Sequence, residues 1–443
     1  MRYLVNTDSD RREMLAEIGV ESIDDLFSDI PEEVKARFRP LGLSSKSELE
    51  VRGTVERFAS NNADPNEVIS FLGGGMYDHY IPSVVAHVLS RSEFYTAYTP
   101  YQPEISQGTL TAMFEFQTLV CELFGMEVAN ASMYDGGSAL AEAVLMAERV
   151  AGKGRIGISR ALFPHYRRVV ETYAWAADLE LIEVPYLTPE GRIDRSAIPS
   201  GLSGLVVQSP NAFGVIEDLT GLKNKVRDGL LIVATNPIAM GIIAPPGEFG
   251  ADIVTAEGQP LGIPPSFGGP GLGLFATRMR YIRTMPGRIA GRTVDAAGNP
   301  GYTMTLQTRE QHIRRARATS NICTNAQLSA LAATVYLATL GADGLAQVAR
   351  LNLAKAHYLA GRIAELPGYA LAFTGPFFNE FVVRVPGDPE TIRARLLSAG
   401  VAVSDPGWLS ALGVEGAIAF AVTERRSREE LDRVVDALRE AGE

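Results

Sequence analysis

Lysine is rare in this chain, so each candidate for amine chemistry can be considered by name. Of the 41 basic residues, six are lysine and 41 − 6 = 35 are arginine. The lysines are Lys35, Lys46, Lys153, Lys223, Lys225 and Lys355. Lysine is the side chain that forms imines with carbonyl compounds. Lys223 and Lys225 precede an apolar run at 230–234, and Lys153 and Lys355 are typical of helix ends or helix surfaces.

An aromatic loop at residues 94–108 carries the densest set of groups that could contact a ligand or another protein. Three tyrosines and two prolines precede a helix that is expected to begin near Glu104. Proline restricts φ, so the hydroxyls are presented on a stiff loop. The alternative is a buried aromatic loop whose hydroxyls are satisfied internally. We favour ligand or partner contact, and the candidate residues are Tyr95, Tyr98, Thr99, Tyr101, Gln102 and Glu104.

Small residues open a second predicted helix at 130–138, followed by an apolar helical stretch at 138–150. Free backbone N–H groups at such a helix start can bind an anion. Asp135 is a natural N-cap, however, and its carboxylate would occupy those donors and repel a phosphate. A capped helix and a phosphate site therefore both stay open for the segment that contains Asn130, Ser132, Asp135, Gly136 and Gly137.

A loop rich in glycine and proline at 256–271 follows the apolar run 252–255. The carboxyl ends of strands are where α/β folds place their sites. This loop contains no nucleophile, no acid–base pair and no cluster of metal ligands. The early part of the chain also lacks the GxGxxG pattern of a dinucleotide site.

A basic segment at 309–323 stands out in an otherwise acidic chain and is predicted to be a helix. Its candidates for contact with a partner's carboxylates are Arg309, His312, Arg314 and Arg315, since arginine binds carboxylates with two parallel hydrogen bonds. A solvated helix face explains the same pattern equally well. His312 could act as a base, but a lone histidine is more often structural.

The elements that must position these segments alternate between strand and helix. Apolar runs are expected to be strands at 155–159, 179–184, 204–208, 230–234, 252–255 and 273–277, and helices are expected at 138–150, 166–177 and 219–227. Such alternation predicts an α/β fold with a mostly parallel sheet. We expect a helical arm at 1–64, a large α/β domain at 65–320 and a small α+β domain at 321–443. The last helix, 428–440, begins with a capping box of Ser427 and Glu430.

Composition excludes several classes of protein. The formal charge is 41 − 52 = −11, which argues against a nucleic-acid scaffold. No unbroken apolar run reaches the roughly 18 residues of a membrane span. The two cysteines are too few for a disulfide framework or a zinc site. The opening residues lack a signal core, so we expect a cytoplasmic protein with no membrane partner.

Together these segments resemble the P-protein family of the glycine cleavage system, glycine dehydrogenase (decarboxylating). They resemble most closely subunit 1, the alpha chain of the form that is split into two chains. The resemblance covers essentially the whole chain and is carried by residues 10–18, 98–108, 130–136 and 309–323. It implies the aspartate aminotransferase type of pyridoxal-phosphate fold (fold type I). It also implies an enzyme that decarboxylates glycine and passes the aminomethyl group to the lipoyl arm of H-protein.

The residues indicate which half of the split enzyme this chain resembles. The family's catalytic half has a His-Lys pair before the glycine-rich loop, and this chain has Gly258-Gln259 there. Gln259 cannot form an imine, and the strand end at 231–236 lacks the acid that would protonate the cofactor's ring nitrogen. The expectation is a non-lysine subunit with a degenerate cofactor site. Subunit 2 would hold the pyridoxal phosphate in an α2β2 assembly, and the aromatic loop would complete its active site.

Two rival interpretations stay open at this point. One is an independent pyridoxal-phosphate enzyme that uses Lys223 or Lys225. The other is a regulatory or interaction subunit with a degenerate enzyme fold.

Overall fold

The computed structural model describes residues 5–63 and 68–442. Its contacts cluster into two compact units, Met1–Ala63 and Asp64–Glu443, which are described separately. The first unit contains the helices α1 (Asp8–Ile18), α2 (Glu32–Lys35) and α3 (Glu48–Ala59). Capping boxes start α1 at Thr7 and α3 at Ser47. None of these helices buries a side chain.

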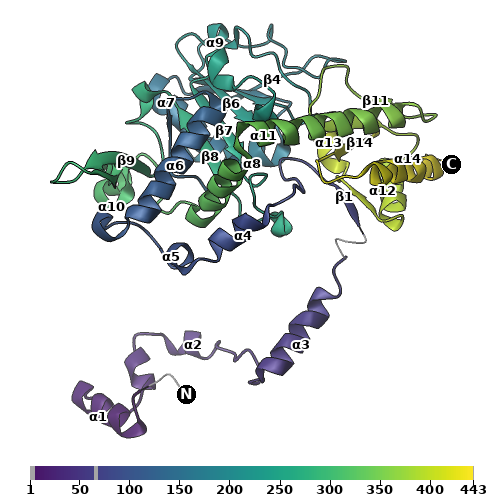
Figure 1. The fold of residues 1–443 in the computed structure, drawn as a ribbon. Coiled ribbons are helices and arrows are strands. Elements are labelled where there is room, and N and C mark those ends of the chain that lie inside the picture. Colours follow the sequence, from purple (N-terminus) through teal and green to yellow (C-terminus); the bar gives the residue numbers. More distant parts are fainter. Residues whose placement is uncertain (1–4, 64–67, 443) are drawn as a thin grey trace. The chain divides into compact units, whose positions relative to one another are not determined.

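A seven-stranded sheet forms the centre of the second unit (Figure 1). Its order is β2-β8-β7-β6-β5-β3-β4; the four neighbouring pairs from β7 through β4 are parallel, and β8 runs antiparallel to both β7 and β2. The strands are β2 (Val128–Ala129), β3 (Arg155–Ser159), β4 (Glu180–Val184), β5 (Gly204–Ser209), β6 (Leu230–Thr235), β7 (Ile253–Glu257) and β8 (Gly273–Thr277).

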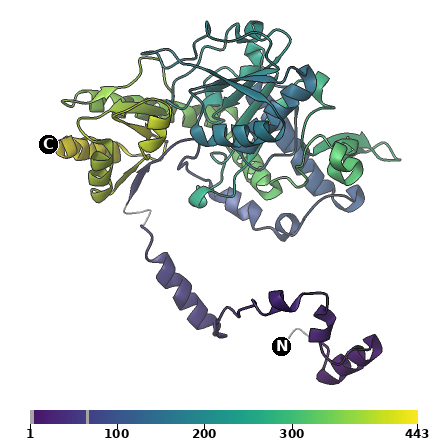
Figure 2. The same cartoon turned by 180° about the vertical axis from the view of Figure 1, so that it is seen from behind.

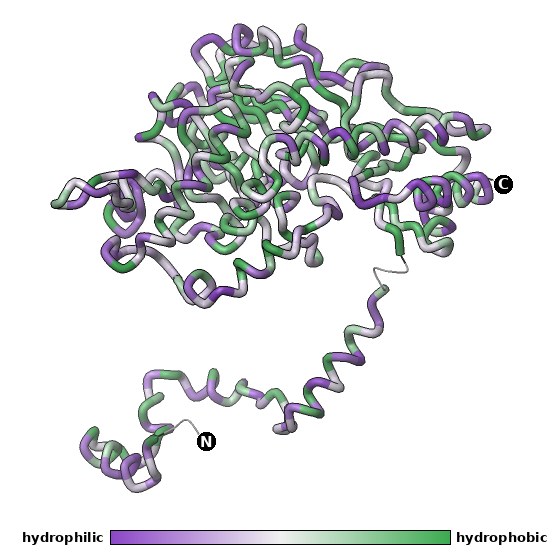
Figure 3. The backbone as a smooth tube through the Cα atoms, in the orientation of Figure 1, coloured by the Kyte–Doolittle hydropathy of each residue, from purple (hydrophilic) through white to green (hydrophobic). Residues whose placement is uncertain are grey.

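Helices cover both faces of this sheet, which explains why its strands are continuous apolar runs. One face packs on α7 (Gly136–Ala151) and α8 (Pro164–Ala176), and buries Val206 and Ile232 there. The other face packs on α6 (Gln107–Phe124) and α11 (Gln327–Ala364), and buries Leu205, Val207 and Leu231. The hydrophobic colour in Figure 3 is accordingly dense along the central strands.

A smaller α+β part is formed mostly by the chain after α11, which Figure 2 shows from behind in yellow-green, and β1 from earlier in the chain joins it. Its sheet has the order β11-β12-β14, and β1 pairs with β13 in parallel. The elements are β1 (Ile69–Phe71), β11 (Ala370–Leu371), β12 (Glu380–Arg384), α12 (Pro389–Ser398), β13 (Val401–Val403), α13 (Gly407–Ala411), β14 (Ala417–Ala421) and α14 (Arg428–Gly442). The Ser427–Glu430 capping box is present, and Leu431, Val434 and Leu438 of α14 are buried.

Helix α11 is the one helix of residues 5–63 and 68–442 that is long and apolar enough to cross a membrane by length and composition. Such a property is also typical of the core helix of a globular domain. Here α11 packs on α4 (Ser83–Leu89), α6 and α14, and its backbone leaves helical geometry at Gly341.

The structure corrects two expectations about local structure and adds a hairpin that the sequence did not reveal. Residues 309–323 do not form one helix: two short 3₁₀ turns flank α10 (Gln311–Arg314), and Arg315 has a φ of 51°. The helix expected at 219–227 is only α9 (Leu222–Lys225). The hairpin of β9 (Ile289–Val294) and β10 (Pro300–Thr305) was not predicted, because these half-exposed strands contain no continuous apolar run.

Candidate functional site

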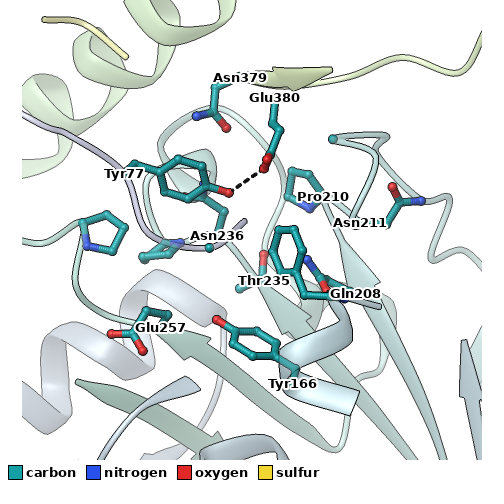
Figure 4. Close-up of a pocket in the computed structure, with 15 residues that line it drawn as sticks. Tyr77, Tyr166, Gln208, Pro210, Asn211, Thr235, Asn236, Glu257, Asn379 and Glu380 are labelled. Atoms are coloured by element: carbon teal, nitrogen blue, oxygen red, sulfur yellow. Dashed lines mark hydrogen bonds between the residues drawn. The ribbon is translucent and has the colours of Figure 1, made fainter. Parts of the chain in front are cut away.

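The carboxyl ends of β5, β6 and β7 meet a narrow pocket (Figure 4). Its lining includes Tyr77, Tyr166, Gln208, Asn236, Glu257 and Glu380. The free space between these side chains is about 20 Å³, which is room for roughly one water molecule. Sites for small molecules usually have about 300–1,000 Å³. The protein's own side chains therefore fill the place where α/β folds bind ligands.

Gln259 is held by hydrogen bonds at both ends of its amide. Its Oε1 accepts from the Tyr77 N–H at 2.8 Å, and its Nε2 donates to the carbonyls of Tyr77 (3.0 Å) and Ile263 (2.6 Å). The side chain is 1 % exposed. Gln259 thus ties the segment at Tyr77 to the glycine-rich loop after β7, which is a structural use of this position.

The carboxylate of Glu257, at the end of β7, occupies the start of α7. Its Oε2 accepts from the Gly136 N–H at 2.8 Å, and its Oε1 accepts from the N–H groups of Gln259 and Leu272, both at 2.9 Å. Asp135 caps the same helix by accepting from the Ser138 N–H at 2.6 Å. The capping by Asp135 is present, and a second carboxylate that the sequence did not reveal accepts from another N–H of the first turn.

Burial gives this pocket its electrostatic character. It raises the pKa of Glu257 to about 7, an effect that the three N–H donors oppose. It also raises the pKa of Glu380 to about 7, although Glu380 accepts from the Gly74 N–H and the Tyr77 hydroxyl, both at 2.9 Å. The pKa of Tyr166 lies well above its usual range for the same reason. Above pH 7, where both carboxyl groups are ionised, their charge makes the pocket unfavourable for an anionic ligand.

The raised pKa of Glu380 predicts how stability depends on pH. Between its ordinary value of 4.5 and about 7, the folded protein retains a proton that the unfolded chain has lost. The contribution of Glu380 to stability is therefore largest below 4.5 and falls as the pH rises to about 7. Glu380→Gln keeps an acceptor for Gly74 and a polar partner for Tyr77, but does not ionise. We expect the stability of wild type relative to Glu380→Gln to fall by up to about 1.4 kcal/mol per pH unit in this window.

Urea denaturation of both proteins at pH 5, 6, 7 and 8 measures this difference. Glu415→Gln, at an exposed position, is the control and should show no such trend. A difference between wild type and Glu380→Gln that stays constant with pH would contradict the assignment.

Of the segment that the sequence left open as a phosphate site, the two glycines lie at the pocket, whereas Asn130 and Ser132 contact other parts of the chain. Gly136 lies against Glu257, and an added Cβ there would lie 2.6 Å from the Tyr166 hydroxyl. Gly137 is buried beside it. Asn130 and Ser132 do not line the pocket: Asn130 Nδ2 donates to the Pro286 carbonyl at 3.1 Å, and Ser132 Oγ accepts from the Ala326 N–H at 3.0 Å.

The aromatic loop lies on the surface, so the buried alternative is wrong. Tyr95, at the end of α5 (Ser92–Tyr95), is 56 % exposed, and Tyr98 is 76 % exposed. Tyr101, Gln102 and Glu104 are also exposed, and Thr99 is half-buried. The loop precedes a short 3₁₀ turn and α6, which begins at Gln107 and not near Glu104.

The structure brings the basic segment next to this loop. The rings of Tyr101 and His312 are 6.2 Å apart at their centroids in an edge-on arrangement. His312, Arg314 and Arg315 are exposed. Arg309 is buried instead, and its guanidinium donates to the carbonyls of Leu306 (3.1 Å), Met285 and Gly287 (2.9 Å). Arg309 is therefore absent from the surface of this chain.

The sequence did not reveal three charged residues with central positions. Glu257 lies at the pocket, and Arg288 and Glu310 lie beside the aromatic loop and the basic segment. Glu257 was recognisable only as the residue that ends an apolar run before the glycine-rich loop. Arg288 and Glu310 stand among other arginines and polar residues, and no local pattern distinguishes them. Lys223 does not line the pocket, and its ammonium pairs with Asp252 at 2.7 Å.

The fold and the position of the pocket define the class of protein as the fold type I architecture of pyridoxal-phosphate enzymes. A sphingosine-1-phosphate lyase from Burkholderia pseudomallei K96243 superposes with a TM-score of 0.65, 14% identity and coverage of 93% of this chain and 94% of that chain. A solved structure titled glycine decarboxylase (P-protein) of the glycine cleavage system, in inhibitor-bound form, matches with a TM-score of 0.90, 40% identity and full coverage of both chains.

The sequence comparisons are more specific. The family model described as glycine cleavage system P-protein matches residues 1–438. A probable glycine dehydrogenase (decarboxylating) subunit 1 of Carboxydothermus hydrogenoformans is 49% identical, with 99% of each chain covered. The protein with the same description in Thermomicrobium roseum is 50% identical, with 100% of each chain covered. The chain belongs to the glycine cleavage system P-protein family.

The residues of this chain do not fit the cofactor that its fold is named for. Gln259 has no amine that could form an imine, and the Glu257 carboxylate accepts from the Gly136 N–H at the start of α7, where a phosphate would need that donor. Thr235 and Asn236 end β6 without a carboxylate. The space of about 20 Å³ is too small for a pyridine ring. The pocket is packed protein interior.

Proposed function

We propose that this chain is the non-lysine alpha subunit of a two-chain glycine decarboxylase, the P-protein of the glycine cleavage system. Its partner, subunit 2, holds the pyridoxal phosphate, and the assembled enzyme decarboxylates glycine and transfers the aminomethyl group to the lipoyl arm of H-protein. The observation that carries this proposal is the Glu257 carboxylate on the Gly136 N–H, next to a fully hydrogen-bonded Gln259. A chain with this site belongs to a working enzyme only through a partner.

The aromatic loop is what this chain contributes to the shared active site. Tyr95 and Tyr98 are more than half exposed, on a loop whose Pro100 is buried. Exposed hydroxyls on a fixed loop can donate hydrogen bonds to glycine, to the partner's cofactor or to the entering lipoyl arm. Thr99, Tyr101, Gln102 and Glu104 lie in the same loop and complete the contributed set.

The exposed basic residues beside the loop extend this surface toward the partner. His312, Arg314 and Arg315 are solvent-facing in this chain and suit carboxylates of subunit 2. We infer an α2β2 heterotetramer in the cytoplasm, with the loop and these residues at the contact between the two kinds of chain.

Hydride trapping tests where the cofactor is held. The purified chain and its complex with subunit 2 are incubated with pyridoxal phosphate, reduced with borohydride and analysed by peptide mass spectrometry. We expect a pyridoxyl adduct on subunit 2 and none on this chain, because Gln259 has no amine. An adduct on Lys223, Lys225 or any other lysine of this chain would overturn the proposal and favour an independent enzyme.

Exchange of labelled bicarbonate into glycine tests the need for both chains. Subunit 2 and lipoylated H-protein are assayed with and without this chain. We expect exchange only when both chains are present. Full exchange by subunit 2 alone would instead identify this chain as a regulatory or interaction subunit.

A further inference from the structure

We propose that Arg288 is a positioning residue that clamps the aromatic loop in the geometry the shared active site requires. The proposal rests on the proposed function for the role of the loop, but the clamp itself is a property of this chain. Arg288 is 3 % exposed and lies immediately before β9. Its side chain is therefore buried and contacts the loop from the protein interior.

The guanidinium of Arg288 reaches two residues of the loop at once. Its Nη1 donates to the Thr99 hydroxyl at 3.3 Å, and its Nη2 donates to the Tyr101 hydroxyl at 3.2 Å. The guanidinium carbon also lies 5.5 Å from the centre of the Tyr101 ring. These contacts join residues 189 and 187 positions apart in sequence. Thr99 and Tyr101 flank the buried Pro100, so the clamp holds both sides of the loop's fixed point.

A buried carboxylate holds the other side of the guanidinium. Glu310 is 5 % exposed, and its Oε2 lies 3.8 Å from Arg288 Nε, a distance set by charge attraction and too long for a hydrogen bond. Among the described residues, Arg288 Nε has no hydrogen-bond acceptor, and neither Glu310 oxygen accepts a hydrogen bond. The charge of Glu310 therefore orients Arg288 while its two Nη groups stay directed at the loop.

The turn that leads into Arg288 is held from two directions. Asn130 Nδ2 donates to the Pro286 carbonyl, and the Arg309 guanidinium donates to the carbonyl of Gly287. Gly287 has a φ of 80°, and an added Cβ would lie 2.6 Å from Asn130 Nδ2, so glycine is required there. The Arg288 carbonyl in turn accepts from the Ala131 N–H at 2.8 Å. Asn130 and Arg309 thus support the clamp.

Arginine is the side chain that this geometry needs. A planar guanidinium presents donors in a fixed fork, whereas a lysine ammonium is a point charge on a flexible stem. Arg288→Lys keeps the positive charge beside Glu310 but loses the simultaneous contacts with Thr99 and Tyr101. Arg292→Lys, at an exposed position of β9, is the matched control.

Hydrogen exchange and turnover in the assembled two-chain enzyme test the clamp together. For Arg288→Lys we expect faster amide exchange confined to peptides covering 94–105, and glycine turnover lowered about 10- to 100-fold through misplacement of the loop. Arg292→Lys should change neither. Unchanged exchange in 94–105 for a correctly assembled Arg288→Lys enzyme would overturn the proposal.

A second variant keeps the test decisive if Arg288→Lys does not assemble. The double substitution Thr99→Val, Tyr101→Phe removes the two acceptors and leaves Arg288 and Glu310 in place. It should loosen the same peptides, because it breaks the same contacts between Arg288 and the loop. No increase in exchange from the double substitution would overturn the clamp.

The two proposals fail in distinguishable ways. A loosened loop with normal turnover upholds the clamp and contradicts the contribution of the loop to the shared site. Normal loop exchange in Arg288→Lys, together with reduced turnover in Tyr98→Phe, contradicts the clamp and leaves the proposed function supported.

Discussion

Replacing Tyr98 by Phe is expected to lower glycine turnover of the assembled enzyme about 10²–10³-fold, because one positioned donor in an active site has an effect of that size. Tyr98 is the most exposed of the three loop tyrosines, and its hydroxyl is 3.5 Å from Thr324 Oγ1, which is only a weak contact. The hydroxyl is therefore available to a substrate or to the partner's cofactor. The substitution removes one oxygen and leaves the ring, so assembly should be unchanged.

Turnover should be measured as aminomethyl transfer to H-protein, and assembly by size-exclusion chromatography or sedimentation of the mixed subunits. Tyr80→Phe is the matched control, because Tyr80 is 63 % exposed and belongs to a different segment. Unchanged turnover in a normally assembled Tyr98→Phe enzyme would remove this hydroxyl from the mechanism. Reduced turnover that follows lost assembly would indicate a scaffold role instead.

Replacing Gln259 by Ala is expected to destabilise the chain by about 3 kcal/mol or more. The change leaves the Tyr77 N–H and the Ile263 carbonyl without a partner in a buried place, and the Tyr77 carbonyl keeps only the His79 N–H as a donor. Each unsatisfied buried group costs about 1–3 kcal/mol. No catalytic group of this chain is removed, so the effect should appear in folding and not in chemistry.

The urea midpoint, followed by tryptophan fluorescence, measures this loss of stability. Gln347→Ala, at an exposed position of α11, should leave the midpoint nearly unchanged. A Gln259→Ala protein as stable as wild type would mean that the hydrogen bonds of Gln259 do not hold the segment at Tyr77. The bicarbonate exchange assay with subunit 2, performed where the variant is folded, separates stability from activity.

Much of this protein was accessible from its sequence because the relevant signals are local. The strands of the central sheet are buried on both faces, so they appear as continuous apolar runs, and β3, β5 and β6 begin at the predicted residues and end at or within one residue of the predicted position. Capping residues such as Asp135 and Ser427 act over three positions, and their hydrogen bonds are present. The lack of an amine at Gln259 is likewise visible as a residue type at one position.

The tertiary structure alone decided what these residues contact. Glu257 meets the Gly136 N–H across 121 positions, and Arg288 meets the aromatic loop across nearly 190. The predicted helix at 309–323 failed for a related reason: Arg309 and Glu310 are drawn into the interior by partners on other segments, which breaks the local pattern. Periodicity and capping report interactions within a few residues, whereas a buried charge is placed by whichever distant groups fold against it.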